Sequence, residues 1–140
     1  MSYYLDTSFL VSILFDDAHT DRAFSWLERG PAQLYVSDWA MTELFALIQR
    51  RVRAGALEED VATAALLEFD AFTGSRTTRL PLSAGIGALA AHLARDSALK
   101  LSSADALHLA LSADGDHRLV TFDLRLAEAA RARGYAVEIP

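Results

Sequence analysis

Four acidic residues occupy positions that a purely structural role explains least well: Asp6, Glu43, Asp105 and Asp123. Asp6 ends the uncharged run Tyr3-Tyr4-Leu5, and Asp123 ends the run Leu119-Val120-Thr121-Phe122, so both follow predicted buried strands. If such carboxylates gather at one sheet edge, their repulsion raises their pKa values and costs stability unless a cation neutralises them. An all-oxygen site in a chain without cysteine suits Mg²⁺ or Mn²⁺.

Glu43 and Asp105 also have structural interpretations, which the sequence leaves open. Glu43 can be a flanking residue of its predicted helix, near Arg50 or another base. Ser102-x-x-Asp105 matches a capping box, in which the acid accepts a hydrogen bond from a backbone N–H at the helix start. His108 follows Asp105 by one turn on a helix that is apolar nearly all round. A buried histidine bonded to the backbone is favoured there over a metal ligand or proton shuttle.

The other two acids differ in how easily a structural role accounts for them. Asp123 can be the N-cap of the last helix. Asp6 has the weakest structural alternative, because Thr7 or Ser8 can cap a helix that begins at Ser8. In open sheets with helices on both faces, ligands bind beyond the carboxyl ends of the strands, which is where Asp6 and Asp123 are expected.

The composition is that of one ordinary globular domain, with 140 residues, 52% of them apolar and 23% charged. The formal charge of -6 argues against a broad basic surface for nucleic acid. It does not argue against a nuclease, because a bound metal reverses the local sign for a phosphodiester. No segment approaches the roughly 18 apolar residues of a membrane span, and the N-terminus lacks a signal-peptide pattern. With no cysteine, these features favour a cytoplasmic protein.

Strand and helix signals alternate along the chain. Strands are expected before Asp6 and at about residues 33–36, 77–82, 118–121 and 135–139. Helices are expected at about residues 8–15, 18–29, 38–53, 57–72, 83–99, 101–112 and 124–133, with Gly74 closing the fourth. This order predicts an α/β fold in which a parallel sheet, with the first strand at its centre, carries helices on both faces.

Four motifs support a family resemblance. They are Leu5-Asp6-Thr7-Ser8, Ser37 with Glu43 six residues on, Ala104-Asp105-Ala106-Leu107-His108-Leu109-Ala110, and Thr121-Phe122-Asp123 with Leu126-Ala127 behind it. As a set, in this order and over essentially the whole chain, they resemble the PIN domain. The resemblance is closest to the VapC-type toxin ribonucleases of bacterial and archaeal type II toxin-antitoxin pairs.

The resemblance implies a single PIN domain over residues 1–140, built as a three-layer α/β/α sandwich with five parallel strands in the order 3-2-1-4-5. It implies that Asp6, Glu43, Asp105 and Asp123 hold Mg²⁺ or Mn²⁺. The hydroxyls of Thr7, Ser8 and Thr121 would orient these carboxylates or the metal-bound water. The family's fourth motif often carries Asn where this chain has Phe122, a departure that leaves the acid in place.

The same resemblance implies a Mg²⁺-dependent endoribonuclease that hydrolyses RNA phosphodiesters as a toxin, forms a homodimer and is bound by a small cognate, VapB-like antitoxin. The antitoxin peptide would lie across the acidic pocket and offer an Arg or Lys to the acids. Its apolar docking surface is expected near the first helices, at Phe9, Ile13, Phe15, Phe24, Trp26 and Trp39. The alternative is a non-catalytic module that uses the same fold for protein contacts, although the presence of all four acids weighs against it.

Overall fold

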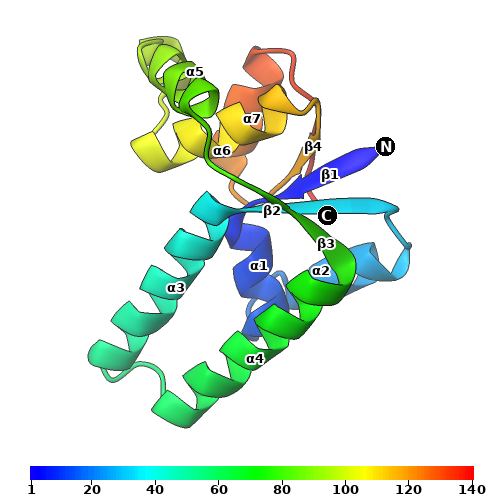
Figure 1. Ribbon diagram of the computed structural model, residues 1–140, viewed down its shortest axis with the longest axis vertical. Coiled ribbons are helices and arrows are strands. Elements are labelled where there is room, and N and C mark those ends of the chain that lie inside the picture. Colours follow the sequence, from blue (N-terminus) through cyan, green and yellow to red (C-terminus); the bar gives the residue numbers. More distant parts are fainter.

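A five-stranded parallel sheet forms the middle layer of the computed structural model, which describes residues 1–140 (Figure 1). The strands are β1 (Ser2–Leu5), β2 (Gln33–Ser37), β3 (Thr77–Leu80), β4 (Arg118–Val120) and β5 (Val137–Glu138). They lie in the order β3-β2-β1-β4-β5, and every neighbouring pair is parallel. The predicted fold class, the strand order and the central position of the first strand are therefore confirmed.

Helices cover both faces of the sheet and complete an α/β/α sandwich (Figure 1). The layer drawn below the sheet contains α1 (Thr7–Leu14), α2 (Thr20–Glu28), α3 (Asp38–Arg53) and α4 (Glu59–Arg76). The layer above it contains α5 (Ala84–Ala94), the 3₁₀ helix η1 (Ser97–Leu99), α6 (Ser103–Asp114) and α7 (Leu124–Ala132). None of these helices has the length and apolar character needed to cross a membrane.

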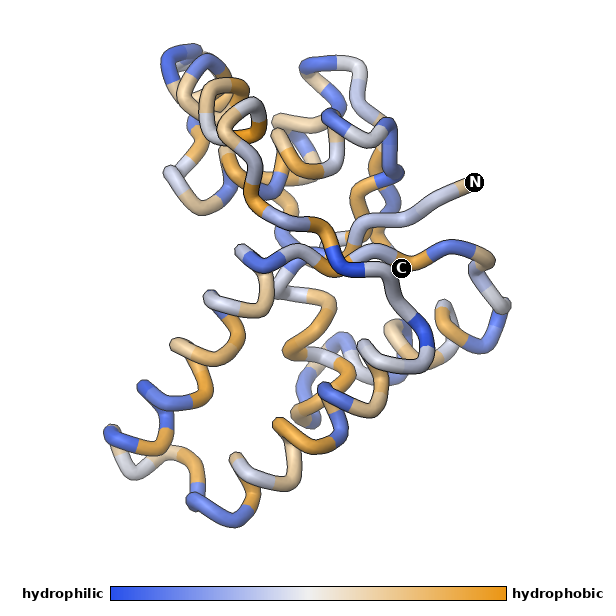
Figure 2. The backbone as a smooth tube through the Cα atoms, in the orientation of Figure 1, coloured by the Kyte–Doolittle hydropathy of each residue, from blue (hydrophilic) through white to orange (hydrophobic).

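Two hydrophobic cores, one on each face of the sheet, hold the layers together. Successive residues of a strand point to opposite faces. Leu5 and Val120 accordingly pack into the lower core, whereas Tyr4 and Leu119 pack into the upper core. Figure 2 shows hydrophobic residues of α3 and α4 on the sides that these two helices turn toward each other. Asp6, which follows Leu5, lies at the end of this central strand.

The fourth helix extends further than the sequence suggests. α4 continues to Arg76, so Gly74 lies inside the helix instead of closing it. The helix ends only where Thr77 enters β3 and pairs with Leu34 of β2. Glycine is a weak helix former, but tertiary packing routinely overrides local propensity, and Phe69 anchors this helix in the lower core.

The C-terminal half also contains two shorter elements than expected. The helix expected over residues 83–99 stops before Asp96, whose carboxylate accepts a hydrogen bond from the Ala98 backbone N–H at 3.0 Å and starts η1. Such a local side-chain bond competes with continuation of a helix. β5 is short because only Val137 and Glu138 pair with β4.

The expected surplus of exposed apolar residues near the first helices is largely absent. Phe9 and Trp26 belong to the lower core, with exposures of 0% and 3%. Ile13, Phe15 and Trp39 are half-buried. Among the six residues named for this surface, Phe24 alone is strongly exposed, at 47%.

Leu44→Ala should lower the free energy of unfolding by about 2–5 kcal/mol, because Leu44 is fully buried in the lower core and its loss leaves a cavity. Leu67→Ala is the matched control, since Leu67 is also helical but 66% exposed. It should change the free energy of unfolding by less than about 0.5 kcal/mol. Urea unfolding followed by circular dichroism measures both values, and equal losses would contradict this assignment of the core.

Candidate active site

Asp6 follows β1 directly and is the N-cap of α1. Its Oδ1 accepts hydrogen bonds from the Phe9 backbone N–H at 3.0 Å and from Ser8 Oγ at 2.7 Å. Its Oδ2 accepts a hydrogen bond from Thr121 Oγ1 at 2.5 Å. The expectation that Thr7 or Ser8 caps this helix was wrong, because the helix begins one residue earlier than predicted and Asp6 itself reaches the free N–H.

Burial dominates the electrostatics of Asp6, which is only 3% exposed. Desolvation raises the pKa of this carboxyl, while the nearby His108 and the hydrogen bonds from Thr121, Ser8 and the Phe9 N–H act in the opposite direction. No arginine, lysine or histidine forms an ion pair with it. A buried carboxylate without a cationic partner is costly, so a cation bound here would stabilise the fold.

The turn that carries Asp123 is connected to Asp6 through two hydroxyl groups. Thr121 Oγ1, which donates to Asp6, accepts from the Asp123 backbone N–H at 2.9 Å. Ser8 Oγ, which also donates to Asp6, accepts from the Phe122 backbone N–H at 2.9 Å. Asp123 Oδ1 caps α7 by accepting from two backbone N–H groups at 2.9 and 3.2 Å, which confirms the predicted N-cap. The ends of β1 and β4 are thereby held together.

Glu43 lies in α3 and has two partners, neither of them Arg50. Thr7 Oγ1 donates a hydrogen bond to Glu43 Oε2 at 2.7 Å, and His108 Nε2 contacts the same oxygen. Partial burial acts to raise the pKa of Glu43, but the bonds and charge of His108 and the bond from Thr7 outweigh it and lower this pKa. The Glu43 carboxylate is therefore held in its ionised form.

His108 is buried, as predicted, but its partners are side chains and not the backbone. Its Nδ1 is 2.8 Å from the Tyr4 hydroxyl, which is in turn 2.8 Å from Ser37 Oγ. A hydrogen-bonded chain thus runs from Ser37 through Tyr4 and His108 to Glu43. No spacing in the sequence connects these four residues, because they come from β1, β2, α3 and α6.

Asp105 lies half-buried in the first turn of α6. Ser102 Oγ accepts a hydrogen bond from its backbone N–H at 3.1 Å, which is one half of the expected capping box. The reciprocal bond, from the Asp105 carboxylate to the helix start, is not formed. This carboxylate is therefore free to face a ligand.

The four acids do not assemble a metal cage: Asp6 and Asp123 cap α1 and α7, Asp105 lies in the first turn of α6, and Glu43 lies in the second turn of α3. No three His, Asp or Glu side chains stand close enough together to ligate one ion as they are placed. Their chemistry nevertheless fits a hard dication: Asp6 is buried without a cation, and the carboxylate of Asp105 makes no hydrogen bond. Carboxylate oxygens are the ligands that such an ion prefers.

A hollow of about 380 Å³ opens beside Ser8 and Asp123. His19 and Phe122 also line it, and their rings stack with centroids 4.4 Å apart. Phe122 also stacks with Phe9, with ring centroids 5.9 Å apart. The residue that departs from the family's motif therefore serves as a packing element that joins the site to the lower core.

The chain is an α/β/α sandwich with a parallel sheet in the order β3-β2-β1-β4-β5, and Asp6 lies at the carboxyl end of the central strand. Within that class, the chain belongs to the PIN domain family, whose model matches residues 3–132. No curated protein matches the chain in sequence. The predicted family is thus confirmed.

Several solved structures are similar to this chain. VapC20 of Mycobacterium tuberculosis, a toxin that cleaves the sarcin-ricin loop, has a TM-score of 0.73 and 21% identity, covering 91% of this chain and 95% of its own. VapBC2 of Rickettsia felis, bound to a DNA fragment from its promoter, has a TM-score of 0.73 and 19% identity, covering 99% and 98%. DNA-bound VapBC of Salmonella typhimurium has a TM-score of 0.71 and 17% identity, covering 99% and 97%. At these identities the likeness establishes the fold.

Tyr4→Phe should lower the free energy of unfolding by about 1–3 kcal/mol, because it leaves His108 Nδ1 buried without a partner. Tyr3→Phe is the matched control in the same strand, since the Tyr3 hydroxyl contacts only Met1 Sδ at an exposed position. Its effect should stay within about 0.5 kcal/mol. Denaturant unfolding compares the two variants, and a small loss in both would refute a stabilising role for the network.

Proposed function

We propose that this chain is the endoribonuclease toxin of a VapBC-type toxin-antitoxin module and hydrolyses RNA phosphodiesters with the help of Mg²⁺ or Mn²⁺. The observation that carries the proposal is Asp6, a buried carboxylate that forms no ion pair, at the carboxyl end of the central strand. Membership of the PIN domain family and the likeness to VapC20, a toxin that cleaves the sarcin-ricin loop, support it. Asp6, Glu43, Asp105 and Asp123 would hold the metal.

The bound dication would lower the pKa of a water molecule and offset negative charge on the phosphate. Side chains of the protein would orient the metal ligands and accept the proton. Ser8 and Thr121 fix both oxygens of Asp6 by hydrogen bonds, so this carboxylate is oriented before any ligand arrives. Glu43 is held ionised by His108 and Thr7, and its Oε1, which makes no hydrogen bond, can accept a proton from an attacking water.

The competing function is a non-catalytic module that uses the PIN fold for protein contacts. The structural roles of two of the acids favour this alternative, since Asp6 and Asp123 each cap a helix. It does not account for the buried charge of Asp6, because an Asn at this position would cap α1 without that cost.

Asp6→Asn separates these functions. We expect it to lower metal-dependent cleavage of RNA at least about 100-fold, since it removes a ligand charge. Its melting temperature without metal should equal or exceed that of the wild type, because a buried unpaired charge is removed and the cap is kept. Cleavage of a fluorogenic RNA with Mg²⁺, Mn²⁺ or EDTA, together with thermal unfolding, measures both effects. Asp16→Asn, at an exposed position outside the site, is the control.

Metal binding supplies a readout besides activity. Millimolar Mg²⁺ or Mn²⁺ should raise the melting temperature of the wild type, and should raise that of Asp6→Asn less. Unchanged cleavage by Asp6→Asn, or its outright unfolding, would disprove the assignment. A stable wild type with neither a metal-dependent shift nor cleavage would favour the non-catalytic module.

We further propose that a small VapB-like antitoxin docks on the lower helical layer. An apolar groove of about 290 Å³ lies between α1, α2 and α4, and its lining includes Ile13, Phe24, Leu27 and Phe72. The likeness to VapC proteins solved with their VapB partners supports this occupant. A cytoplasmic homodimer remains the expected assembly of the toxin, on the family resemblance.

Phe24→Asp should weaken binding of the cognate antitoxin by about tenfold or more, because it places a charge in the apolar groove. Leu67→Asp is the control, as Leu67 is also helical and exposed but lies outside the groove. Isothermal titration with the antitoxin encoded beside this chain compares them. Equal affinity of the two variants would exclude the groove as the docking site.

A further inference from the structure

Two basic residues, Lys100 and Arg125, line a separate hollow in the upper layer. The hollow has a volume of about 450 Å³ and lies between the end of η1 and one side of α7. Leu99 and Ala129 contribute apolar walls, and Glu128 is its one acidic lining residue. No carboxylate forms an ion pair with either cation, so both charges are available to a ligand.

Local structure disfavours both cations where they stand. Lys100, the only lysine of the chain, adopts a left-handed backbone conformation with φ 52° and ψ 35°, which suits Gly or Asn better than a long side chain. Arg125 lies in the first turn of α7, where the helix dipole opposes a positive charge. Fold stability therefore explains neither residue.

The other basic residues mostly have visible structural reasons. Arg29, Arg79 and Arg133 form ion pairs with carboxylates. Five further arginines lie in the last turns of α3, α4 and α7, where the helix dipole favours a cation: Arg50, Arg51, Arg53, Arg76 and Arg131. Lys100 and Arg125 differ from both groups.

We propose that Lys100 and Arg125 bind a backbone phosphate of the RNA, next to the phosphate that is cleaved. The inference rests on the proposed function, because it assigns part of the substrate to this hollow. Asp105 lies in the first turn of α6, five residues after Lys100, and Asp123 caps α7, two residues before Arg125. Figure 1 shows both helices in the same layer above the sheet.

The negative charge of the chain means that RNA binding requires local cations. The chain carries a formal charge of -6, and its acidic edge opposes the approach of RNA. A pair of unpaired cations beside that edge gives the strand local attraction and a fixed position. Glu128 opposes this attraction, so removing its charge should strengthen RNA binding.

The test measures binding of a fluorescent single-stranded RNA in EDTA, where no cleavage occurs, as a function of salt. Lys100→Ala with Arg125→Ala should weaken binding about tenfold and reduce the slope of log affinity against log salt by about 0.7, the value for one phosphate contact to a single strand. Glu128→Gln should tighten binding. Lys100→Arg with Arg125→Lys should retain the wild-type affinity and slope, since both charges remain.

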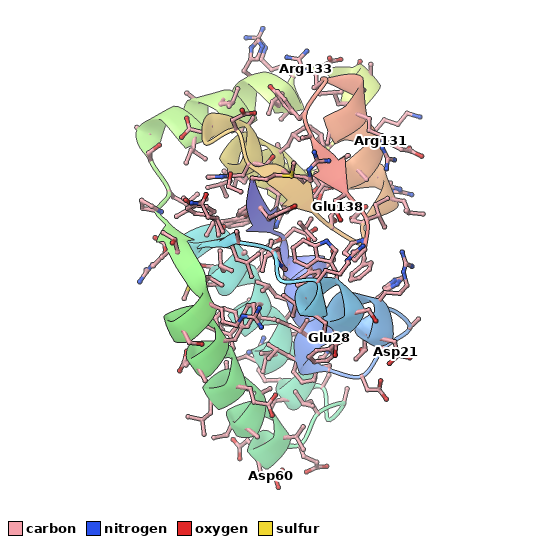
Figure 3. All side chains as sticks on the ribbon, turned by 90° about the vertical axis from the view of Figure 1, so that its right-hand side faces the viewer. Asp21, Glu28, Asp60, Arg131, Arg133 and Glu138 are labelled. Atoms are coloured by element: carbon pink, nitrogen blue, oxygen red, sulfur yellow. The ribbon has the colours of Figure 1, made fainter.

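The control removes two charges elsewhere, by Arg50→Ala with Arg53→Ala, at exposed positions near the end of α3. That end adjoins the start of α4, and Figure 3 shows Asp60, in the first turn of α4, opposite the end of the molecule that carries Arg131 and Arg133. The control should change RNA affinity less than twofold. With metal present, the Lys100/Arg125 double variant should raise KM and leave kcat nearly unchanged.

Equal effects of the test and control pairs would overturn the phosphate site while leaving the ribonuclease proposal intact. Loss of antitoxin affinity without loss of RNA affinity would overturn it in favour of an acidic peptide in the hollow. A wild type that neither binds RNA in EDTA nor cleaves it with metal would overturn both proposals.

Discussion

The buried carboxylate of Asp6 is the constraint to which the rest of the site is fitted. It stands where the central strand ends, so it is enclosed by both helical layers and loses most of its hydration. Three protein donors compensate it in part, and two of them, Ser8 and Thr121, also hold the turn that carries Asp123. The hydrogen bonds that compensate the buried Asp6 therefore also keep the end of β1 aligned with the end of β4.

A second polar system secures the other side of the site. The chain from Ser37 through Tyr4 and His108 to Glu43 joins two strands, α6 of the upper layer and α3 of the lower layer. Each member satisfies a group that would otherwise be buried without a partner, which makes the network costly to interrupt. Glu43 thus bonds to a histidine whose other ring nitrogen is held by Tyr4.

Much of the fold follows from local pattern, because uncharged runs and helical spacing recur with clear turn signals between them. The strand order could be predicted from the family resemblance, and the bounds of α3 match the pattern closely. The errors lie where tertiary contacts outweigh propensity, as for Gly74 inside α4, or where one side chain starts a new turn, as for Asp96. The four acids were visible in sequence, but the partners of Glu43 were not, because long-range contacts through Tyr4 and His108 leave no periodic signal.

The division of the interior into two cores has an optical consequence. The two tryptophans contact different cores: Trp26 belongs to the lower core, and Trp39, in the first turn of α3, packs against the upper one. Trp26 also meets Phe9 edge-on at 5.3 Å, close to the start of α1. Intrinsic tryptophan emission therefore samples both cores without any added label, and coincident melting of variants that each keep one tryptophan would mark the sandwich as a single cooperative unit.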